Sequence, residues 1–393
     1  MYFIYRIFAA NKCYIYRKYA VNMYMHQLKA WPDFTWDAEF VLPQLGNVRH
    51  RQGLILGQMN ALGFKLKEHA LLDTLTLDVT KSSEIEGELL STDQVRSSIA
   101  RRLGINLTHP VNASRDVEGV VEMMLNATQH YNEILTDDRL YGWHAALFPT
   151  GRTGMHKITV GAWRTPDAGP MQVVSGAIGK EKIHFEAPDA TLLPQEMILF
   201  LNWFNGQNDL DPVIKAAIAH LWFVTIHPFD DGNGRIARAL TDMQLARADN
   251  SPQRFYSMSA QILKEKSVYY NLLEKTQKGD LDITEWISWF LDCLDRAMDS
   301  TVQTLSGVFS RFNFWERHGN TALNSRQRQM IGTLLDDFFG KLTSSKWAKM
   351  AKCSADTALR DIQDLVEKGI LEKETGGGRS TSYILLLSDV GEL

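Results

Sequence analysis

The chain has 393 residues, of which 45% are apolar and 22% are charged. At roughly 150 residues per domain, this length predicts two or three domains, and the ordinary globular composition excludes disordered, collagen-like and coiled-coil chains. Lys and Arg number 42 against 46 Asp and Glu, so the formal net charge is −4. That balance provides no overall attraction to nucleic acid or to an anionic membrane.

Cysteine spacing and hydropathy predict a cytoplasmic protein. Cys13, Cys293 and Cys353 are far apart and include no CxxC pair, which is typical of reduced thiols rather than of a disulfide framework or a zinc site. Uninterrupted apolar runs stay shorter than the roughly 18 residues of a membrane-spanning helix, so we expect no membrane partner.

Residues 1–25 differ from the rest of the chain because tyrosines and basic residues are frequent there and acidic residues are absent. Basic residues interrupt each apolar run, so the segment does not have the pattern of a secretory signal. We expect a disordered extension, with the functional chain beginning near Met23 or Met25. A basic, aromatic segment that lies on a membrane surface is the alternative.

The next two regions are predicted to be mainly helical. Residues 26–105 have helical periodicity and predict a regulatory module, in which Ser91 or Thr92 begins a helix. Residues 106–300 form the second predicted domain. Apolar spacing predicts its helices over residues 117–135, 140–147, 194–205 and 212–226, and β-prone residues between turns predict a small hairpin within 158–188.

After residue 320 the pattern begins again, with three helices over 325–339, 344–350 and 355–367 followed by a hairpin with a glycine-rich tip. This order predicts a winged helix-turn-helix domain over residues 321–393. The segment contains ten basic and ten acidic residues. Because DNA-reading modules usually have a basic face, protein contact or domain packing is favoured here over DNA binding.

The stretch His227–Arg238, HPFDDGNGRIAR, lies between two helical runs and predicts a loop that leads into a helix. Gly232 and Gly234 permit backbone conformations in which successive N–H groups converge on one anion, and the helix N-terminus adds its positive dipole there. Arg235 and Arg238 are three residues apart on one helical face, so both guanidinium groups are able to reach phosphate oxygens.

Two further residues of this stretch are candidates for a metal ligand and a base. Asp231 offers the hard oxygen ligand that Mg²⁺ shared with phosphates requires. His227 follows the preceding helix and is able to take a proton from an incoming nucleophile. Each residue alone is more often structural, but a cradle for an anion, a metal ligand and a base together predict phosphoryl or nucleotidyl transfer.

The same stretch resembles the Fic family signature HPFxDGNGRxxR at all nine specified positions. The resemblance implies a mainly α fold whose helical core binds ATP with Mg²⁺ and transfers AMP to a Tyr, Ser or Thr hydroxyl of a protein, with release of pyrophosphate. It implies that His227 is the base, that Asp231 holds Mg²⁺ and that Phe229 anchors the loop. The phosphate-binding residues that it implies are Gly232, Asn233, Gly234, Arg235 and Arg238.

In the Fic family a β-hairpin flap covers the site, and the target polypeptide joins it as an added strand. The resemblance implies that residues 171–188 are this flap, with Val173, Val174 and Ile183 as candidate clamps on the target. Tyr269 resembles a family tyrosine near the adenine, with helix packing as the alternative. Gln277 stands where some relatives place an adenine-contacting asparagine.

The segment SSEIEG, residues 82–87, resembles the inhibitory [S/T]xxxE[G/N] motif of autoinhibited Fic proteins, with Ser82, Glu86 and Gly87 in its three positions. A carboxylate paired with Arg238 would occupy the guanidinium that holds the γ-phosphate and would repel that phosphate. The sequence therefore predicts a built-in inhibitory glutamate. The alternative is a solvated glutamate in an acidic turn.

From roughly residue 30 to 385 the chain resembles bacterial Fic proteins that are protein adenylyltransferases and that end in a winged helix. Three alternatives stay open. The first is an enzyme that also, or only, runs in reverse and removes AMP. The second is an enzyme that transfers UMP, phosphocholine or phosphate instead of AMP. The third is a DNA-binding regulator that uses the Fic domain as its nucleotide sensor. A homodimer and an unidentified protein substrate are the remaining expected partners.

Overall fold

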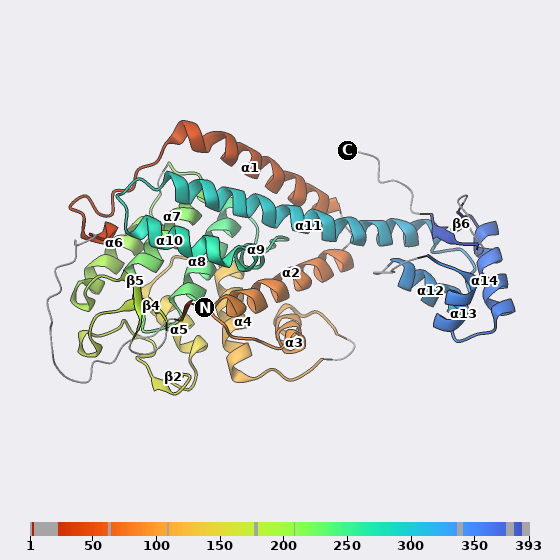
Figure 1. The fold of residues 1–393 in the computed structure, drawn as a ribbon, viewed down its shortest axis with the longest axis horizontal. Coiled ribbons are helices and arrows are strands. Elements are labelled where there is room, and N and C mark those ends of the chain that lie inside the picture. Colours follow the sequence, from red (N-terminus) through yellow and green to blue (C-terminus); the bar gives the residue numbers. More distant parts are fainter. Residues whose placement is uncertain are drawn as a thin grey trace. The chain divides into compact units, whose positions relative to one another are not determined.

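The computed structural model describes residues 2–3, 23–61, 64–107, 110–176, 180–207, 209–335, 341–374 and 381–386. The chain divides into two compact units, Met1–Thr301 and Val302–Leu393. The described residues are mainly helical, as the sequence predicted (Figure 1). Most of the predicted N-terminal extension, including residues 4–22, lies outside the described residues. Met25, where we expected the functional chain to begin, is fully buried.

The helices of the first unit begin close to where capping residues predicted them. They are α1 (Ala38–Ala61), α2 (Phe64–Ile85), α3 (Thr92–Leu103), α4 (Arg115–Gln129), α5 (Asp137–Leu147), α6 (Leu193–Asn205), α7 (Pro212–Ile226), α8 (Asn233–Asp249), α9 (Met258–Lys264), α10 (Lys266–Gln277) and the start of α11 (Thr284–His318). Ser91 caps α3 by accepting a hydrogen bond from Gln94, and Asp211 caps α7. Helix α2 continues to Ile85, so it includes most of the predicted inhibitory segment, residues 82–87.

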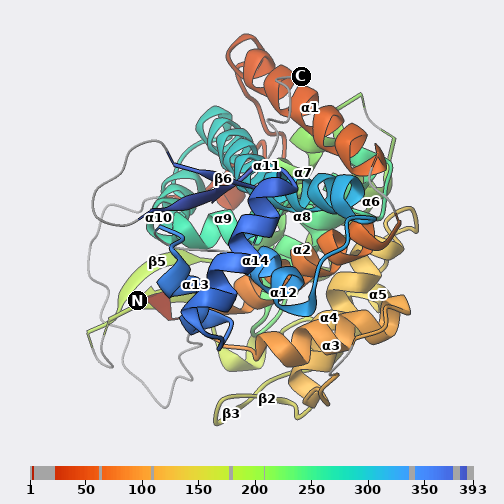
Figure 2. The same ribbon diagram turned by 90° about the vertical axis from the view of Figure 1, so that its right-hand side faces the viewer.

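Helices α7 and α8 form the centre of the first unit. Every side chain of α7 from Val213 to Ile226 is buried, as expected for a helix that is apolar on almost all sides. Figure 2 shows α3, α4 and α5 lying side by side, and contacts between α4 and α8 join this group to the centre. No helix of the described residues combines the length and the apolarity that crossing a membrane would require.

The predicted hairpin is present. Strands β4 (Gln172–Ser175) and β5 (Lys182–Glu186) pair antiparallel, with an irregularity between Val173 and Val174. The other edge of β4 pairs with β1 (Tyr2–Phe3), so the order of this sheet is β1-β4-β5. A second small hairpin consists of β2 (Arg152–Thr153) and β3 (His156–Lys157).

The second unit contains the end of α11, then α12 (Ser325–Leu335), α13 (Ser344–Met350), α14 (Ala355–Glu367) and the antiparallel strands β6 (Leu371–Lys373) and β7 (Tyr383–Leu385). Leu342, between α12 and α13, forms an antiparallel bridge with Tyr383. Thr343 and Ser354 cap α13 and α14, which span the predicted ranges. The winged-helix assignment stays a prediction, and the glycine-rich tip lies outside the described residues.

Substitution of one glycine in each helix tests the packing of α4 on α5. A Cβ on Gly119 would stand 1.8 Å from the Ala146 carbonyl oxygen, whereas a Cβ on Gly142 of α5 would meet no atom within 4 Å. Alanine is favoured over glycine in a helix by about 1 kcal/mol. We therefore expect Gly142→Ala to raise the free energy of unfolding, and Gly119→Ala to lower it by roughly 1–3 kcal/mol because of the clash. Urea unfolding of both variants measures this, and equal effects would contradict the packing.

Candidate functional site

The loop between α7 and α8 begins with a histidine in a backbone conformation that favours glycine. His227 has φ 52° and ψ 59°, a left-handed conformation that costs a non-glycine residue on the order of 1–3 kcal/mol. Surrounding contacts hold it there. The His227 amide donates to the Phe223 carbonyl at 3.0 Å, and Arg164 Nε donates to the His227 carbonyl at 2.8 Å.

Arg164 belongs to the GAWR segment and is a structural residue of this loop. Its side chain is buried, and besides His227 it donates to the Pro188 carbonyl at 2.6 Å. Its backbone amide donates to the Pro228 carbonyl at 2.9 Å. One arginine thereby joins the end of the predicted flap, at Pro188, to the start of the loop between α7 and α8.

Phe229 anchors the middle of the loop. It is fully buried and stacks on His144, with ring centroids 4.2 Å apart. The Asn233 side chain accepts from the Phe229 amide at 3.0 Å and donates to the Phe229 carbonyl at 2.9 Å. Asn233, predicted as part of the phosphate cradle, therefore also closes the loop on the first turn of α8.

The ring of His227 is poised as a neutral base. Nδ1 lies 3.2 Å from the Val224 carbonyl, and because a carbonyl only accepts hydrogen bonds, Nδ1 carries the proton. Nε2 is buried and has no hydrogen-bond partner among the described residues. Burial, with a smaller contribution from Arg164, lowers the pKa of His227 to about 4. The ring is therefore uncharged at neutral pH, with a lone pair on Nε2.

Asp231 lies half-buried beside this histidine. Its Oδ2 accepts from the Thr153 hydroxyl at 2.6 Å, and its Oδ1 accepts from the Gly232 amide at 2.5 Å. No cluster of three His, Cys, Asp or Glu that could hold a metal ion occurs among the described residues. Because Mg²⁺ usually takes one or two carboxylates together with phosphates and water, a single aspartate fits such an ion only when a phosphate shares it.

The glycines that follow form a cradle at the N-terminus of α8. Gly232 precedes the helix in the left-handed conformation, with φ 80°, and a Cβ there would stand 2.9 Å from the Phe148 ring. A Cβ on Gly234 would stand 2.2 Å from Glu86 Oε1. An oxyanion of the chain itself therefore already lies over the cradle, which shows that the site accepts negative charge.

Glu86 reaches the cradle because α2 brings it against Arg238. Arg238 Nη2 donates to Glu86 Oε1 at 2.8 Å and to the Ser82 carbonyl at 2.8 Å, and Arg238 Nε donates to Ser82 Oγ at 2.9 Å. The Arg238 side chain is 2% exposed and that of Glu86 is 15% exposed. Arg238 Nη1 is buried without a hydrogen-bond partner among the described residues.

The end of α2 explains why a glycine follows Glu86. Gly87 has φ 88°, and the Glu88 and Gly87 amides donate to the Ser83 and Glu84 carbonyls, each at 3.0 Å. These two bonds form a Schellman motif, which requires a left-handed residue after the last helical turn. The motif turns the chain so that Glu88 also faces α8.

Glu88 and Tyr270 are contacts that sequence reasoning missed. Arg235 Nη1 donates to Glu88 Oε2 at 2.6 Å, and the guanidinium lies 5.0 Å from the centre of the Phe148 ring. Tyr270 hydrogen bonds to Glu86, and burial together with that carboxylate raises the Tyr270 pKa well above its usual value. The sequence Glu-Gly-Glu at residues 86–88 could have suggested the Glu88 contact, since Arg235 and Arg238 lie on one face of α8.

A pocket with about 650 Å³ of space not filled by atoms opens beside these residues. The lining includes Glu86, His227 and Gly234 from the cradle, Tyr269, Tyr270 and Gln277 from α10, and Val173, His184 and Phe185 from the hairpin. The Tyr269 hydroxyl lies 2.8 Å from His220 Nε2.

Val174 and Ile183, which were also predicted to clamp the target, do not line this pocket as Val173 does. Val174 is buried and is absent from the pocket lining, whereas Ile183 is 44% exposed. His184 joins the hairpin to α10, because its Nδ1 lies 2.5 Å from Glu274 Oε2.

Comparisons with known proteins agree with this geometry. A profile of the Fic/DOC family matches residues 134–245, and a profile of a domain of unknown function, DUF4172, matches residues 24–105. A protein adenylyltransferase Fic from Drosophila grimshawi is 36% identical over 113 residues, which are 28% of this chain and 21% of that protein. Protein adenylyltransferase fic-1 from Caenorhabditis briggsae is 28% identical over 219 residues, which are 53% and 38% of the two chains.

A Fic family protein from Desulfovibrio desulfuricans G20 has the same fold, with a TM-score of 0.52 at 19% identity over 92% of this chain and 99% of that one. The chain therefore contains a Fic domain and is related to protein adenylyltransferases. It spans only about a fifth to two fifths of the length of the two adenylyltransferases compared above.

The contact between Glu86 and Gly234 has a direct test. Gly234→Ala should displace the Glu86 carboxylate from Arg238, and the unpaired guanidinium should lower the free energy of unfolding by roughly 1–3 kcal/mol. In a Glu86→Gly background the clash with the carboxylate is absent and only the end of the Arg238 side chain, 3.2 Å from the added Cβ, has to shift, so the same substitution should cost much less. Urea unfolding of the four chains gives the coupling between the two positions. An equal cost in both backgrounds would show that Glu86 does not lie over Gly234.

Proposed function

We propose that the protein is a protein adenylyltransferase that transfers AMP from ATP to a Tyr, Ser or Thr hydroxyl of a protein and is autoinhibited by Glu86. The observation that carries this proposal is the Glu86 carboxylate, which occupies an anion cradle next to the unpartnered Nε2 of His227. Nε of Arg235 and Nη1 of Arg238, both buried and without a hydrogen-bond partner in the described part of the chain, would supply further donors for phosphate oxygens.

In the proposed reaction His227 Nε2 takes the proton of the target hydroxyl as the hydroxyl oxygen bonds to the α-phosphorus of ATP. The bond from that phosphorus to the bridging oxygen breaks, and pyrophosphate leaves with the bond's electron pair. Gly232, Gly234 and Arg235 hold the phosphates, and Arg238 holds the γ-phosphate once Glu86 has moved. Mg²⁺ on Asp231 would neutralise the charge that develops between the α- and β-phosphates.

The pocket supports the remaining assignments. Tyr269, Tyr270 and Gln277 line it from α10 and are proposed to contact the base, while the hairpin with Val173 lies across it as the flap that binds the target. Removal of AMP would be the reverse activity: a water positioned by Glu86 would bond to the phosphorus of the AMP–protein ester, and the target oxygen would leave with the electron pair of the broken bond and take up a proton. We propose a cytoplasmic location, as the sequence predicted.

Substitution of the inhibitory glutamate tests the function. Glu86→Gly should increase self-modification with labelled ATP at least several-fold, because Arg238 is then free for the γ-phosphate, and His227→Ala in that background should abolish it. Glu84→Gly is the matched control, since Glu84 lies on the same helix but pairs with Lys81 at 2.7 Å. Intact-mass measurement with each nucleotide donor identifies the group. A Glu86→Gly chain as inactive as the wild type would contradict the proposal.

The second unit supports a second candidate function, DNA binding. Two of the acidic residues that argued against it are paired with basic side chains of the same unit: the buried Asp361 pairs with Arg326 at 2.9 Å, and the partly exposed Asp364 pairs with Lys368 at 2.5 Å. Arg360 of α14 and Lys352 in the turn before it are exposed. These two cations are the charges that we propose would contact a DNA backbone.

Titration of duplex DNA with the full chain distinguishes DNA binding from protein contact. If α14 binds DNA, affinity should fall as salt increases, and Arg360→Ala should weaken binding and reduce the salt dependence by about one charge. Arg328→Ala, which removes an exposed arginine of α12, is the matched control. Absence of binding at low salt would leave protein contact as the role of this unit.

A further inference from the structure

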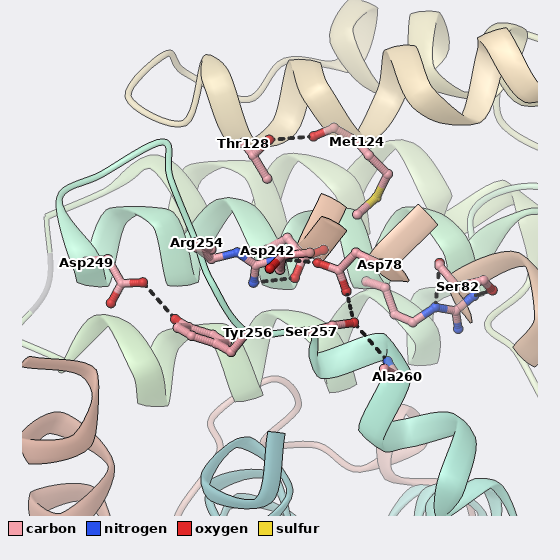
Figure 3. A network of polar contacts seen from close by, with 12 residues as sticks. Asp78, Ser82, Met124, Thr128, Asp242, Asp249, Arg254, Tyr256, Ser257 and Ala260 are labelled. Atoms are coloured by element: carbon pink, nitrogen blue, oxygen red, sulfur yellow. Dashed lines mark hydrogen bonds and ion pairs between the residues drawn. The ribbon is translucent and has the colours of Figure 1, made fainter. Parts of the chain in front are cut away.

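A buried group of three charged residues lies between the inhibitory helix α2 and the catalytic helix α8. Arg254 Nη2 donates to Asp78 Oδ2 of α2 at 2.6 Å, and Arg254 Nη1 pairs with Asp242 Oδ1 of α8 at 2.6 Å. All three side chains are at most 2% exposed. Figure 3 shows Arg254 between the two carboxylates, with Ser257 joining Asp78 to the first turn of α9.

This group is aligned with the inhibitory contact on both helices. Asp78 precedes Ser82 by four residues on α2, and Asp242 follows Arg238 by four residues on α8. Residues four apart share a helical face, so the group continues the contact of Ser82 and Glu86 with Arg238 by one turn.

Apolar packing alone does not fix where α2 stands along α8. Helix α2 packs mainly on α9 and α3 and has fewer contacts with α8. Apolar contacts are non-directional, whereas an arginine that bridges two carboxylates is satisfied in one arrangement only. The position of Glu86 over Gly234 therefore requires a directional contact nearby.

We propose that Asp78, Arg254 and Asp242 are positioning residues. They hold α2 at the position along α8 where Glu86 reaches Arg238. The proposal rests on the proposed function for its activity readout and on the structure alone for its exchange readout. Breaking the group leaves Glu86 intact but loosens the helix that carries it, so the chain should gain activity without any change in the catalytic loop.

Asp78→Asn removes one negative charge from this group of three residues and leaves the side-chain volume almost unchanged. We expect it to increase labelled self-modification by roughly five- to tenfold, the size of a typical coupling between sites. In the Glu86→Gly background the same change should have no further effect, because no inhibitory carboxylate remains to be positioned. Arg254→Lys, which cannot bridge both carboxylates, should act in the same direction and serves as the second variant.

Asp249→Asn is the matched control. Asp249 lies at the end of α8 and accepts from Tyr256 at 2.8 Å and from Gln52 at 2.9 Å, so its loss perturbs α8 without contact to α2. This variant should show no more self-modification than the wild type. The proposal would be overturned if Asp78→Asn did not increase self-modification, or if it increased self-modification equally with and without Glu86.

Amide hydrogen exchange separates this proposal from the proposed function. Exchange of residues 79–88 should become faster in Asp78→Asn and stay unchanged in Asp249→Asn. That result supports the positioning role even if the Glu86→Gly chain transfers no nucleotide, in which case the proposed function alone is wrong. Unchanged exchange in both variants would overturn the positioning role whatever the activity.

The pH profile gives a readout that a merely structural role would not change. Burial, with a smaller contribution from Asp78, raises the pKa of Asp242 to about 7, while Arg254 and Arg238 oppose the shift. Docking of α2 favours the protonated form, so the inhibitory contact should weaken as pH rises toward about 7. Labelling by the wild type relative to Glu86→Gly should rise over that range. An equal rise in Asp242→Asn would overturn the role of Asp242.

Discussion

One buried cation organises the site. The Arg238 side chain is 2% exposed, and a guanidinium left there without an anion would cost several kcal/mol. Ser82 supplies two oxygens but no charge, so the compensating charge comes from Glu86 in the described structure. In the proposed function a γ-phosphate takes that role. A carboxylate and a phosphate cannot both occupy the space above Gly234, so inhibition and productive binding of ATP exclude one another.

The same constraint extends along both helices. Helix α8 presents Arg235, Arg238 and then Asp242, and the α2 segment presents Glu88, Glu86 and then Asp78 in the corresponding order. Two direct pairs of opposite charge are followed by a pair of like charge, which only Arg254 makes tolerable. The unusual contact is therefore the last one, and it is the one that makes the fit of the helices depend on a third segment of the chain.

Local sequence patterns predicted the parts of this site that are local in the chain. The loop that leads into α8, the cap Ser91 and the hairpin each depend on a few neighbouring residues, and each is present. The residue types and spacing of residues 227–238 predicted an anion cradle, a metal ligand and a base, and the resemblance to the Fic signature added the nucleotide and the transferred group. The Arg238 contact with Glu86 was expected from the resemblance of residues 82–87 to the inhibitory motif, and the ion pair is present.

The contacts that the sequence could not indicate join residues distant in the chain. Arg254 and Asp78 are separated by 176 residues, and in sequence each is an ordinary charged residue next to apolar neighbours. Only packing shows that both are buried, and only burial makes their pairing obligatory. The same holds for Glu88, whose partner is 147 residues away.

The charge arrangement also sets what any activating event must provide. A ligand shifts an equilibrium only by its difference in affinity for the two states. In the proposed function the γ-phosphate of ATP would take the position of Glu86 and compete with its contact to Arg238 directly, whereas a target on the hairpin would not touch α2. Relief by the target alone would have to pass through α10, which carries Tyr270 against Glu86 and Glu274 against His184 of the flap. Helix α10 therefore contacts both the Glu86 carboxylate and the hairpin.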